Sequence, residues 1–199
     1  MKNNYILQAW LVLTLALVFG VSLAAVNNTL SPVIEANKVN ETLEKIPELI
    51  SGKSDSSELK IEPISIEVER GGKKVFYKVF EAKQDGVVKG YVAKSGGQGY
   101  ADKIELLLGL SPKADEITGL FVLEQKETPG LGNKISTDEW RGQYTGKKTD
   151  TALAVVKTGA KNPNEIDSIT GATISSKSVT SIINTVISDL KEPLAKRNG

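Results

Sequence analysis

The chain has 199 residues, enough for one domain of ordinary size and an appendage. It carries 25 Lys and Arg against 24 Asp and Glu, a formal net charge of +1 without a block of like charge, so nucleic acid is not an expected partner. There is no Cys and no His, and Met1 is the only methionine. These absences exclude disulfides, Cys- or His-ligated metals and Ser-His-Asp catalysis, so we expect no metal site. Any redox chemistry would need an organic cofactor, and with such a cofactor no catalytic side chain of the chain's own is expected.

Residues 5–26 are almost entirely apolar, and this length can cross a bilayer as a helix. Lys2 is the only charge before them, which favours a cytoplasmic N-terminus for residues 1–4 and places the rest of the chain outside the cytoplasm. Small residues at 22–24 have cleavage-like spacing, so a cleaved signal peptide is the alternative. The apolar run is longer than a usual signal core, which favours an uncleaved, single-pass anchor.

Residues 27–60 are predicted to form a juxtamembrane helix and a linker. Ser31-Pro32 is typical of a helix start, with Ser as the cap and Pro in the first turn, and a loose apolar stripe follows up to Pro47. Residues 51–57 are small and polar, which indicates a loop or tether.

A strand-rich domain is predicted over residues 61–191. Gly71-Gly72 and Asp85-Gly86 are hairpin signals between apolar or alternating segments. The predicted strands are residues 61–68, 75–80, 87–92, 104–110 and 117–123. Because strands dominate here and helices gather at the ends, we expect an α+β fold with an antiparallel sheet and flanking helices.

Two loops interrupt this sheet. Gly99-Tyr100 ends a glycine-rich stretch that can bring backbone close to a ligand, although such turns are common. Residues 127–132 read Glu-Thr-Pro-Gly-Leu-Gly, a rigid loop that offers backbone N–H groups and one apolar side chain. A planar aromatic ligand with polar edges suits that combination.

The segment after these loops is predicted to return to regular structure. Residues 136–139 resemble a capping box, which predicts a short helix carrying Trp140. Trp140 and Tyr144 can stack on a planar ligand, but core packing is the favoured interpretation. Residues 151–156 are predicted to form a strand, and residues 192–199 a frayed polar tail.

Asp167-Ser168-Ile169-Thr170-Gly171-Ala172-Thr173 precedes an apolar stripe at helical spacing over residues 174–190. Gly171 can take backbone angles closed to other residues. A helix start presents unpaired N–H groups and the positive end of the dipole, which favour an anion such as phosphate. On the residues alone, the hydroxyls here are most simply helix caps.

This stretch resembles the flavinylation motif of the FMN-binding domain family, found in the G subunit of Rnf-type ion-translocating electron transport complexes and in the C subunit of the sodium-translocating NADH:quinone reductase. Asp167, Thr170, Gly171, Ala172 and Thr173 match the motif residue for residue. The resemblance implies that Thr173 carries FMN through a phosphoester, and residues 127–132 match a second family signature. The implied cofactor-binding residues are Gly99, Tyr100, Glu127, Thr128, Leu131, Gly132, Lys134, Thr170, Gly171, Ala172 and Thr173.

The two motifs occur in the family's order, and the short chain favours the Rnf-type subunit over the longer quinone reductase subunit. The resemblance implies a flavoprotein of the cell (inner) membrane that carries electrons on covalent FMN, within a complex coupling ferredoxin/NAD-type electron transfer to ion translocation. Its implied partners are the other membrane subunits and a flavin transferase for maturation. The alternatives are the equivalent quinone reductase subunit and a membrane-tethered binding module without redox function. A secreted hydrolase would lack a His base, although a Lys can serve as one.

Overall fold

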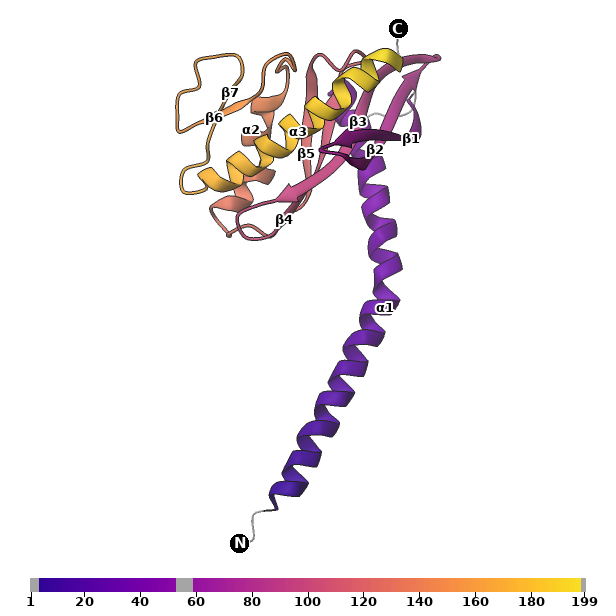
Figure 1. The fold of residues 1–199 in the computed structure, drawn as a ribbon, viewed down its shortest axis with the longest axis vertical. Helices are drawn as coiled ribbons and strands as arrows, with labels where there is room; N and C mark the ends of the chain where they lie inside the picture. The colour runs from indigo at the N-terminus through magenta and orange to yellow at the C-terminus, as the bar shows by residue number, and fades with distance from the viewer. Residues whose placement is uncertain (1–3, 53–58, 198–199) are drawn as a thin grey trace. The chain divides into compact units, whose positions relative to one another are not determined.

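The computed structural model describes residues 4–52 and 59–197, so most of the predicted tether and both chain ends lie outside the described residues. The chain divides into an N-terminal unit, Met1–Glu41, and a second unit, Thr42–Gly199, that holds every described strand (Figure 1). The elements in chain order are α1 (Tyr5–Ser51), β1 (Lys60–Arg70), β2 (Lys73–Gln84), β3 (Val87–Gln98), β4 (Lys103–Leu110), β5 (Ile117–Glu124), η1 (Gly132–Ser136), α2 (Asp138–Arg141), η2 (Gly142–Tyr144), β6 (Ala154–Val156), β7 (Glu165–Asp167) and α3 (Thr173–Arg197).

Helix α1 is continuous over 47 residues and contains the predicted anchor. It is long and apolar enough to cross a membrane, and it carries no charged residue between positions 5 and 34. The predicted helix start at Ser31-Pro32 is wrong. The Ser31 hydroxyl donates to the carbonyl of Asn27 at 2.6 Å, one turn earlier in the same helix, and Pro32 removes one N–H donor without ending the helix.

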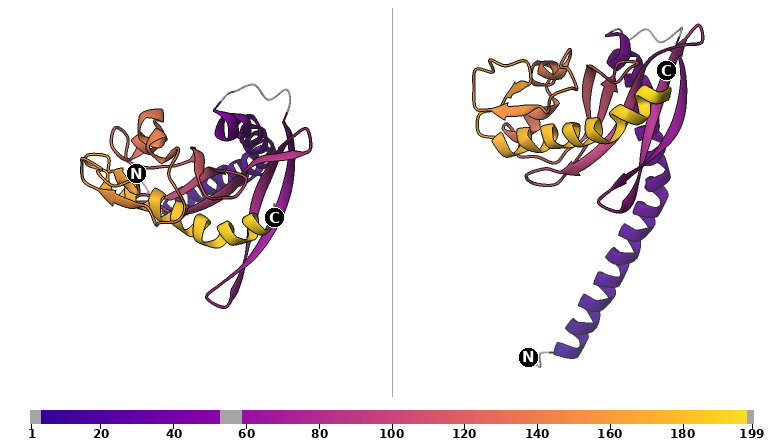
Figure 2. Two further views of the ribbon diagram at one scale, coloured as in Figure 1. Left: turned by 90° about the horizontal axis from the view of Figure 1, so that it is seen from above. Right: turned by 45° about the horizontal axis from the view of Figure 1, so that its top comes forward.

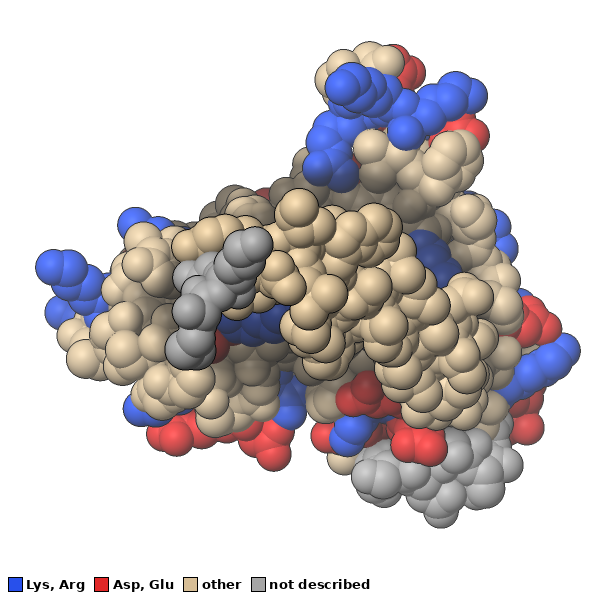
Figure 3. All heavy atoms as spheres, turned by 90° about the horizontal axis from the view of Figure 1, so that it is seen from below, with Lys and Arg blue, Asp and Glu red and all other residues tan. Residues whose placement is uncertain are grey.

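Strands β1 to β5 form one antiparallel sheet in sequential order, and all five predicted strands are present. This arrangement with its flanking helices confirms the predicted α+β class. In the view of Figure 3, charged side chains of both signs lie mostly around the edge of the visible face.

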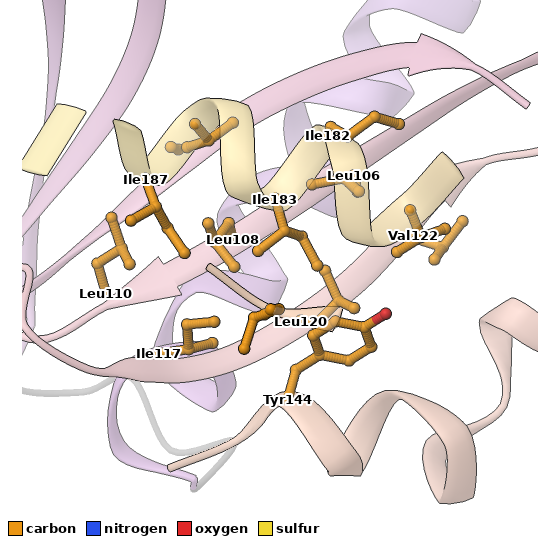
Figure 4. Close-up of a cluster of buried hydrophobic side chains, with 14 of the residues drawn as sticks. Leu106, Leu108, Leu110, Ile117, Leu120, Val122, Tyr144, Ile182, Ile183 and Ile187 are labelled. Carbon is orange, nitrogen blue, oxygen red and sulfur yellow. The ribbon is translucent and has the colours of Figure 1, made fainter. Parts of the chain in front are cut away.

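The larger core lies between this sheet and α3. Leu106 and Leu108 of β4 face α3, and Ile183 of α3 packs against them with no exposed surface (Figure 4). Figure 2 shows α3 lying along this face of the sheet. Burial of these side chains fixes the position of α3, and with it the position of the helix start at Thr173.

The opposite face of the sheet is covered by the last turns of α1. Ile46 and Leu49 are buried there with Leu107, which points away from α3 because side chains alternate along β4. Gly109 and Gly119 pair across β4 and β5, and a Cβ on Gly119 would lie 2.9 Å from the Leu49 side chain. The strand-bearing unit therefore begins within α1, before the predicted domain boundary at residue 61.

The C-terminal part departs from the predictions in its details. Helix α3 continues through Pro193 to Arg197 and buries Leu194 completely, so the predicted frayed tail is wrong up to Arg197. The capping box is also wrong, because α2 begins after Thr137 and has no side-chain cap. The predicted strand at 151–156 is reduced to Ala154–Val156, which pairs in parallel with the unpredicted β7.

Trp140 belongs to the core, as the favoured interpretation held. Its exposed fraction is 6%, and its ring meets that of Tyr144 edge to face with centroids 5.3 Å apart. The indole N–H donates to the carbonyl of Asp167, the last residue of β7, at 2.8 Å. This hydrogen bond holds the end of β7 against Trp140.

Candidate functional site

The loop after β5 is shaped by a tight turn. The Leu131 N–H donates to the carbonyl of Thr128 at 3.2 Å, with Pro129 and then Gly130 between them. Gly130 has φ of +76°, so the turn has the residues that a type II turn requires. The turn holds the Leu131 side chain outward, where 42% of the residue is exposed.

A second turn leads into α3. The Ala172 N–H donates to the carbonyl of Ile169 at 2.9 Å, and Gly171 between them has φ of +81°. A Cβ on Gly171 would lie 3.0 Å from the Leu131 side chain, so the two turns are in contact. Gly130 and Gly171 therefore adopt the positive φ angles that these two turns need, and the turns bring the two loops into contact.

Among the described residues, no side chain caps the start of helix α3. The carbonyl of Ala172 accepts the first helical bond, from Ser176 N at 3.0 Å, so Ala172 occupies the N-cap position. Alanine has no side-chain oxygen, and the first N–H groups of a helix have no carbonyl one turn earlier to bond. The start of α3 is therefore suited to an external anion, and the interpretation of the nearby hydroxyls as caps is wrong.

A cavity of about 560 Å³ lies where these turns meet. Its lining includes seven of the predicted residues and two that the sequence did not indicate, Ile174 and Ser175. The lining residues are Tyr100, Thr128, Leu131, Gly132, Gly171, Ala172, Thr173, Ile174 and Ser175. Tyr100 and Ile174 are 63% and 56% exposed, and with Leu131 they give the cavity an apolar edge of the kind that marks a ligand site.

Ile174 carried a signal that sequence reasoning overlooked. It stands apart from the buried α3 residues that face the sheet, and an apolar residue off the buried stripe at a helix start is available to a ligand. Ser175 carried no such signal, because nothing local to it indicates a partner 48 residues earlier in the chain.

Five of the predicted residues do not line the cavity: Gly99, Glu127, Lys134, Asp167 and Thr170. Lys134 and Thr170 are exposed. The Asp167 carboxylate accepts the Ala160 N–H at 2.9 Å, which fastens the loop before the motif. The structure thus gives Asp167 a role in holding the motif in place.

Glu127 lies behind the cavity wall with an exposed fraction of 4%. Its Oε1 accepts the N–H groups of Tyr100 at 2.9 Å and Ala101 at 3.2 Å, and its Oε2 accepts the Ser175 hydroxyl at 2.6 Å. One carboxylate therefore joins the turn after β3, the loop after β5 and the start of α3.

The hydroxyls near the start of α3 differ in what they bind. Ser168, Ser175 and Ser176 each donate to a carbonyl or carboxylate oxygen of the protein. Thr170 is exposed and lies outside the cavity lining. Thr173 is half-buried, lines the cavity and forms no side-chain hydrogen bond within the described part of the chain.

The arrangement fits a flavin mononucleotide. The apolar edge suits a planar ring, and the uncapped start of α3 suits a phosphate. Gly132 lets the wall pack closely on Glu127 behind it, since a Cβ there would lie 2.8 Å from the Cβ of Glu127 and 3.0 Å from the Ser175 hydroxyl. The residues present are therefore compatible with the cofactor that the sequence resemblance implies.

Comparison with known proteins agrees with this geometry. The model of the FMN-binding domain matches residues 99–188, a range that contains every cavity-lining residue. The chain is 30% identical over 181 residues to the G subunit of the ion-translocating oxidoreductase complex of Methanosarcina acetivorans, which covers 88% of this chain and 90% of the relative. The chain belongs to this G-subunit family with its FMN-binding domain. The predicted resemblance is thereby confirmed.

A second member of the family is more similar over a shorter segment. The G subunit of the Na⁺-translocating ferredoxin:NAD⁺ oxidoreductase complex of Acetobacterium woodii is 41% identical over 126 residues, 62% of this chain. That match spans 60% of the length of the relative. The crystal structure of NqrC from Shewanella oneidensis has the same fold, with a TM-score of 0.69 at 18% identity over 82% of this chain and 98% of that one.

Proposed function

We propose that this protein is the electron-carrying G subunit of an Rnf-type complex, in which ferredoxin/NAD-type electron transfer drives ion translocation. FMN, held by a phosphoester to Thr173, supplies the redox chemistry when bound. Family membership, the FMN-binding domain and the apolar helix α1 support the proposal. The nearly full-length match to a G-subunit protein favours this assignment over the quinone reductase subunit, since the likeness to NqrC supports the fold alone.

The observation that carries the attachment site is the state of the Thr173 hydroxyl. Of the hydroxyls around the start of α3, it is the one that both lines the cavity and has no partner within the described residues. In the attachment step Thr173 Oγ1 loses its proton and bonds to phosphorus, while a bond from phosphorus to its leaving group breaks. A flavin transferase acting on a flavin dinucleotide would release AMP in that step. The helix N–H groups offset the remaining phosphate charge.

The other residues of the cavity hold the ring and exclude water. Leu131 and Tyr100 offer apolar surface from two different loops, and Ile174 offers it from α3. Thr128 contributes its side chain at the same wall. None of these side chains needs to gain or lose a proton, because in this proposal the protein positions FMN and FMN carries the electrons.

The proposal includes a topology. Helix α1 serves as an uncleaved anchor in the cell (inner) membrane, with Lys2 on the cytoplasmic side and the FMN-binding domain on the other. The remaining membrane subunits of the complex are then its partners. Intact mass of the protein purified from membranes tests this together with the flavin, and a mature chain beginning near Ala25 would refute the anchor.

The decisive experiment compares two threonines three residues apart. The full chain is produced in cells that contain the transferase, denatured, and examined by mass and by visible absorbance. Thr173→Ala should abolish attached flavin completely, whereas Thr170→Ala should retain it, because Thr170 lies outside the cavity. Covalent FMN on the Thr173→Ala chain would refute the site. A wild-type chain without flavin would refute the function and favour a tethered binding module.

A further inference from the structure

Glu127 is a buried carboxylate for which the proposed function provides no role. Only 4% of the residue is exposed, and it accepts hydrogen bonds from Tyr100, Ala101 and Ser175. All three partners donate to the carboxylate, so both of its oxygens act as hydrogen-bond acceptors. The hydrogen bond from Ser175 also places the carboxylate beside the first turn of α3, at the positive end of the helix dipole.

The surrounding chain is built to keep this side chain in one position. A Cβ on Gly99 would overlap Glu127 Oε1, and a Cβ on Gly132 would lie 3.0 Å from Oε2. Glycine at both places therefore lets backbone close around the carboxylate. The rotamer is fixed by three hydrogen bonds and by contact on two sides.

No basic side chain neutralises this charge among the described residues. Lys126, its neighbour in the chain, lies instead 3.5 Å from Asp102 on the surface. Three neutral donors satisfy the oxygens of Glu127 but leave its net charge in place. Buried in this way, the charge is poorly screened by water and salt.

The charge lies directly behind the cavity. Tyr100 and Ser175, which donate to Glu127, are both lining residues, and so is Gly132, whose backbone packs against it. Electron uptake adds negative charge to a group in the cavity. A fixed negative charge behind the wall opposes that uptake and lowers the reduction potential.

We infer that Glu127 is a positioning residue with an electrostatic role: it joins the three segments that form the cavity and lowers the reduction potential of the flavin held there. This rests on the proposed function for the presence of FMN. It differs from the ligand role expected from the sequence, because the carboxylate is used by the protein and acts on the cofactor through its charge.

The test is Glu127→Gln in the full chain made with the transferase. The amide oxygen can still accept both N–H groups, and the amide nitrogen can donate to the Ser175 hydroxyl, so shape is kept while the charge is removed. Glu139→Gln removes the same charge from an exposed position on α2 and is the matched control. Attached flavin is measured by intact mass, and the midpoint potential by spectroelectrochemical titration with dithionite.

Both variants should keep the flavin. The Glu127→Gln potential should shift to a more positive value, and the Glu139→Gln potential should equal that of the wild type. A separate readout uses the flavin-free Thr173→Ala background, in which hydrogen exchange at the Tyr100 and Ala101 amides should be unchanged by Glu127→Gln and accelerated by Glu127→Ala.

An unchanged potential in Glu127→Gln would overturn the inference, as would loss of its flavin, or faster exchange at the two amides in that variant. Each result would mean either that the charge of Glu127 does not lower the potential, or that the substitution acts by changing the shape of the cavity. Absence of flavin from the wild type would instead refute the proposed function, so the two failures are distinguishable.

Discussion

Leu49, in the last turns of α1, allows a quantitative test of where the globular unit begins. The residue is 5% exposed and packs on the sheet face that carries Phe80, Val92 and Leu107. Beneath it the paired glycines 109 and 119 present backbone, and a Cβ on Gly109 would lie 2.7 Å from the carbonyl oxygen of Leu49. Backbone in a sheet cannot move to fill a void as a flexible side chain can.

Leu49→Ala should therefore lower the free energy of unfolding by about 3 kcal/mol, within the range of about 2–5 kcal/mol seen for buried leucines. Leu43→Ala is the matched control, since Leu43 lies on the same helix and is 38% exposed. A change within about 0.5 kcal/mol is expected there. The difference between the two variants measures how firmly the end of α1 is docked.

The measurement is urea unfolding of residues 40–199, which lack the membrane-spanning segment. For a domain of this size, a loss of about 3 kcal/mol lowers the melting temperature by roughly 6–12 °C. Equal effects of the two substitutions would refute the docking of Leu49. The docking would also be refuted if a fragment beginning at residue 53 unfolded at the same urea concentration as residues 40–199. That fragment lacks the end of α1, so Phe80, Val92 and Leu107 would be exposed to water.

Two further predictions concern the cavity and the sheet. Leu131→Ala should retain covalent flavin, because Thr173 makes the bond, but should change its absorbance spectrum; an identical spectrum would place the loop away from the ring. Tyr77 has its pKa raised to about 12 by burial and by its hydrogen bond to Asp189, against about 10 in the unfolded chain. Its contribution to stability is therefore complete below pH 10 and is lost as the pH rises to about 12, and Tyr77→Phe should remove that part of the decline in a urea series across this range.

The sheet was predictable because its signals are local. Alternating and apolar segments separated by Gly-Gly and Asp-Gly turns indicated β1, β2 and β3, and an antiparallel order followed from the short connections. The turn after β5 was predictable for the same reason, since Pro129 and Gly130 specify a turn whatever surrounds them. The ligand proposed for the loop after β5 was indicated by the resemblance and not by the chemistry of the loop.

The departures share a cause, which is burial against distant parts of the chain. Leu194 looked like part of a polar tail, but its side chain is buried in the core, and that contact extends α3 past Pro193. Ile46 belonged to a weak local stripe and Leu49 lay beyond its end at Pro47, and the glycines that contact Leu49 lie 60 and 70 residues later. Tertiary packing of this kind outweighs local propensity, and no window of sequence contains it.

The start of α3 shows how a locally unfavourable choice serves a site. Five residues with hydroxyl groups lie within four positions of Ala172, at 168, 170, 173, 175 and 176, yet the N-cap position is occupied by alanine. A Ser, Thr, Asp or Asn there would stabilise the helix by about 1 kcal/mol, because its oxygen would accept the first N–H groups. It would also occupy the donors that a phosphate needs. Ser175 and Ser176 are hydrogen-bonded to other groups, so within the described part of the chain the first turn of α3 keeps unbonded N–H donors and one unbonded hydroxyl, that of Thr173, at the same wall of the cavity.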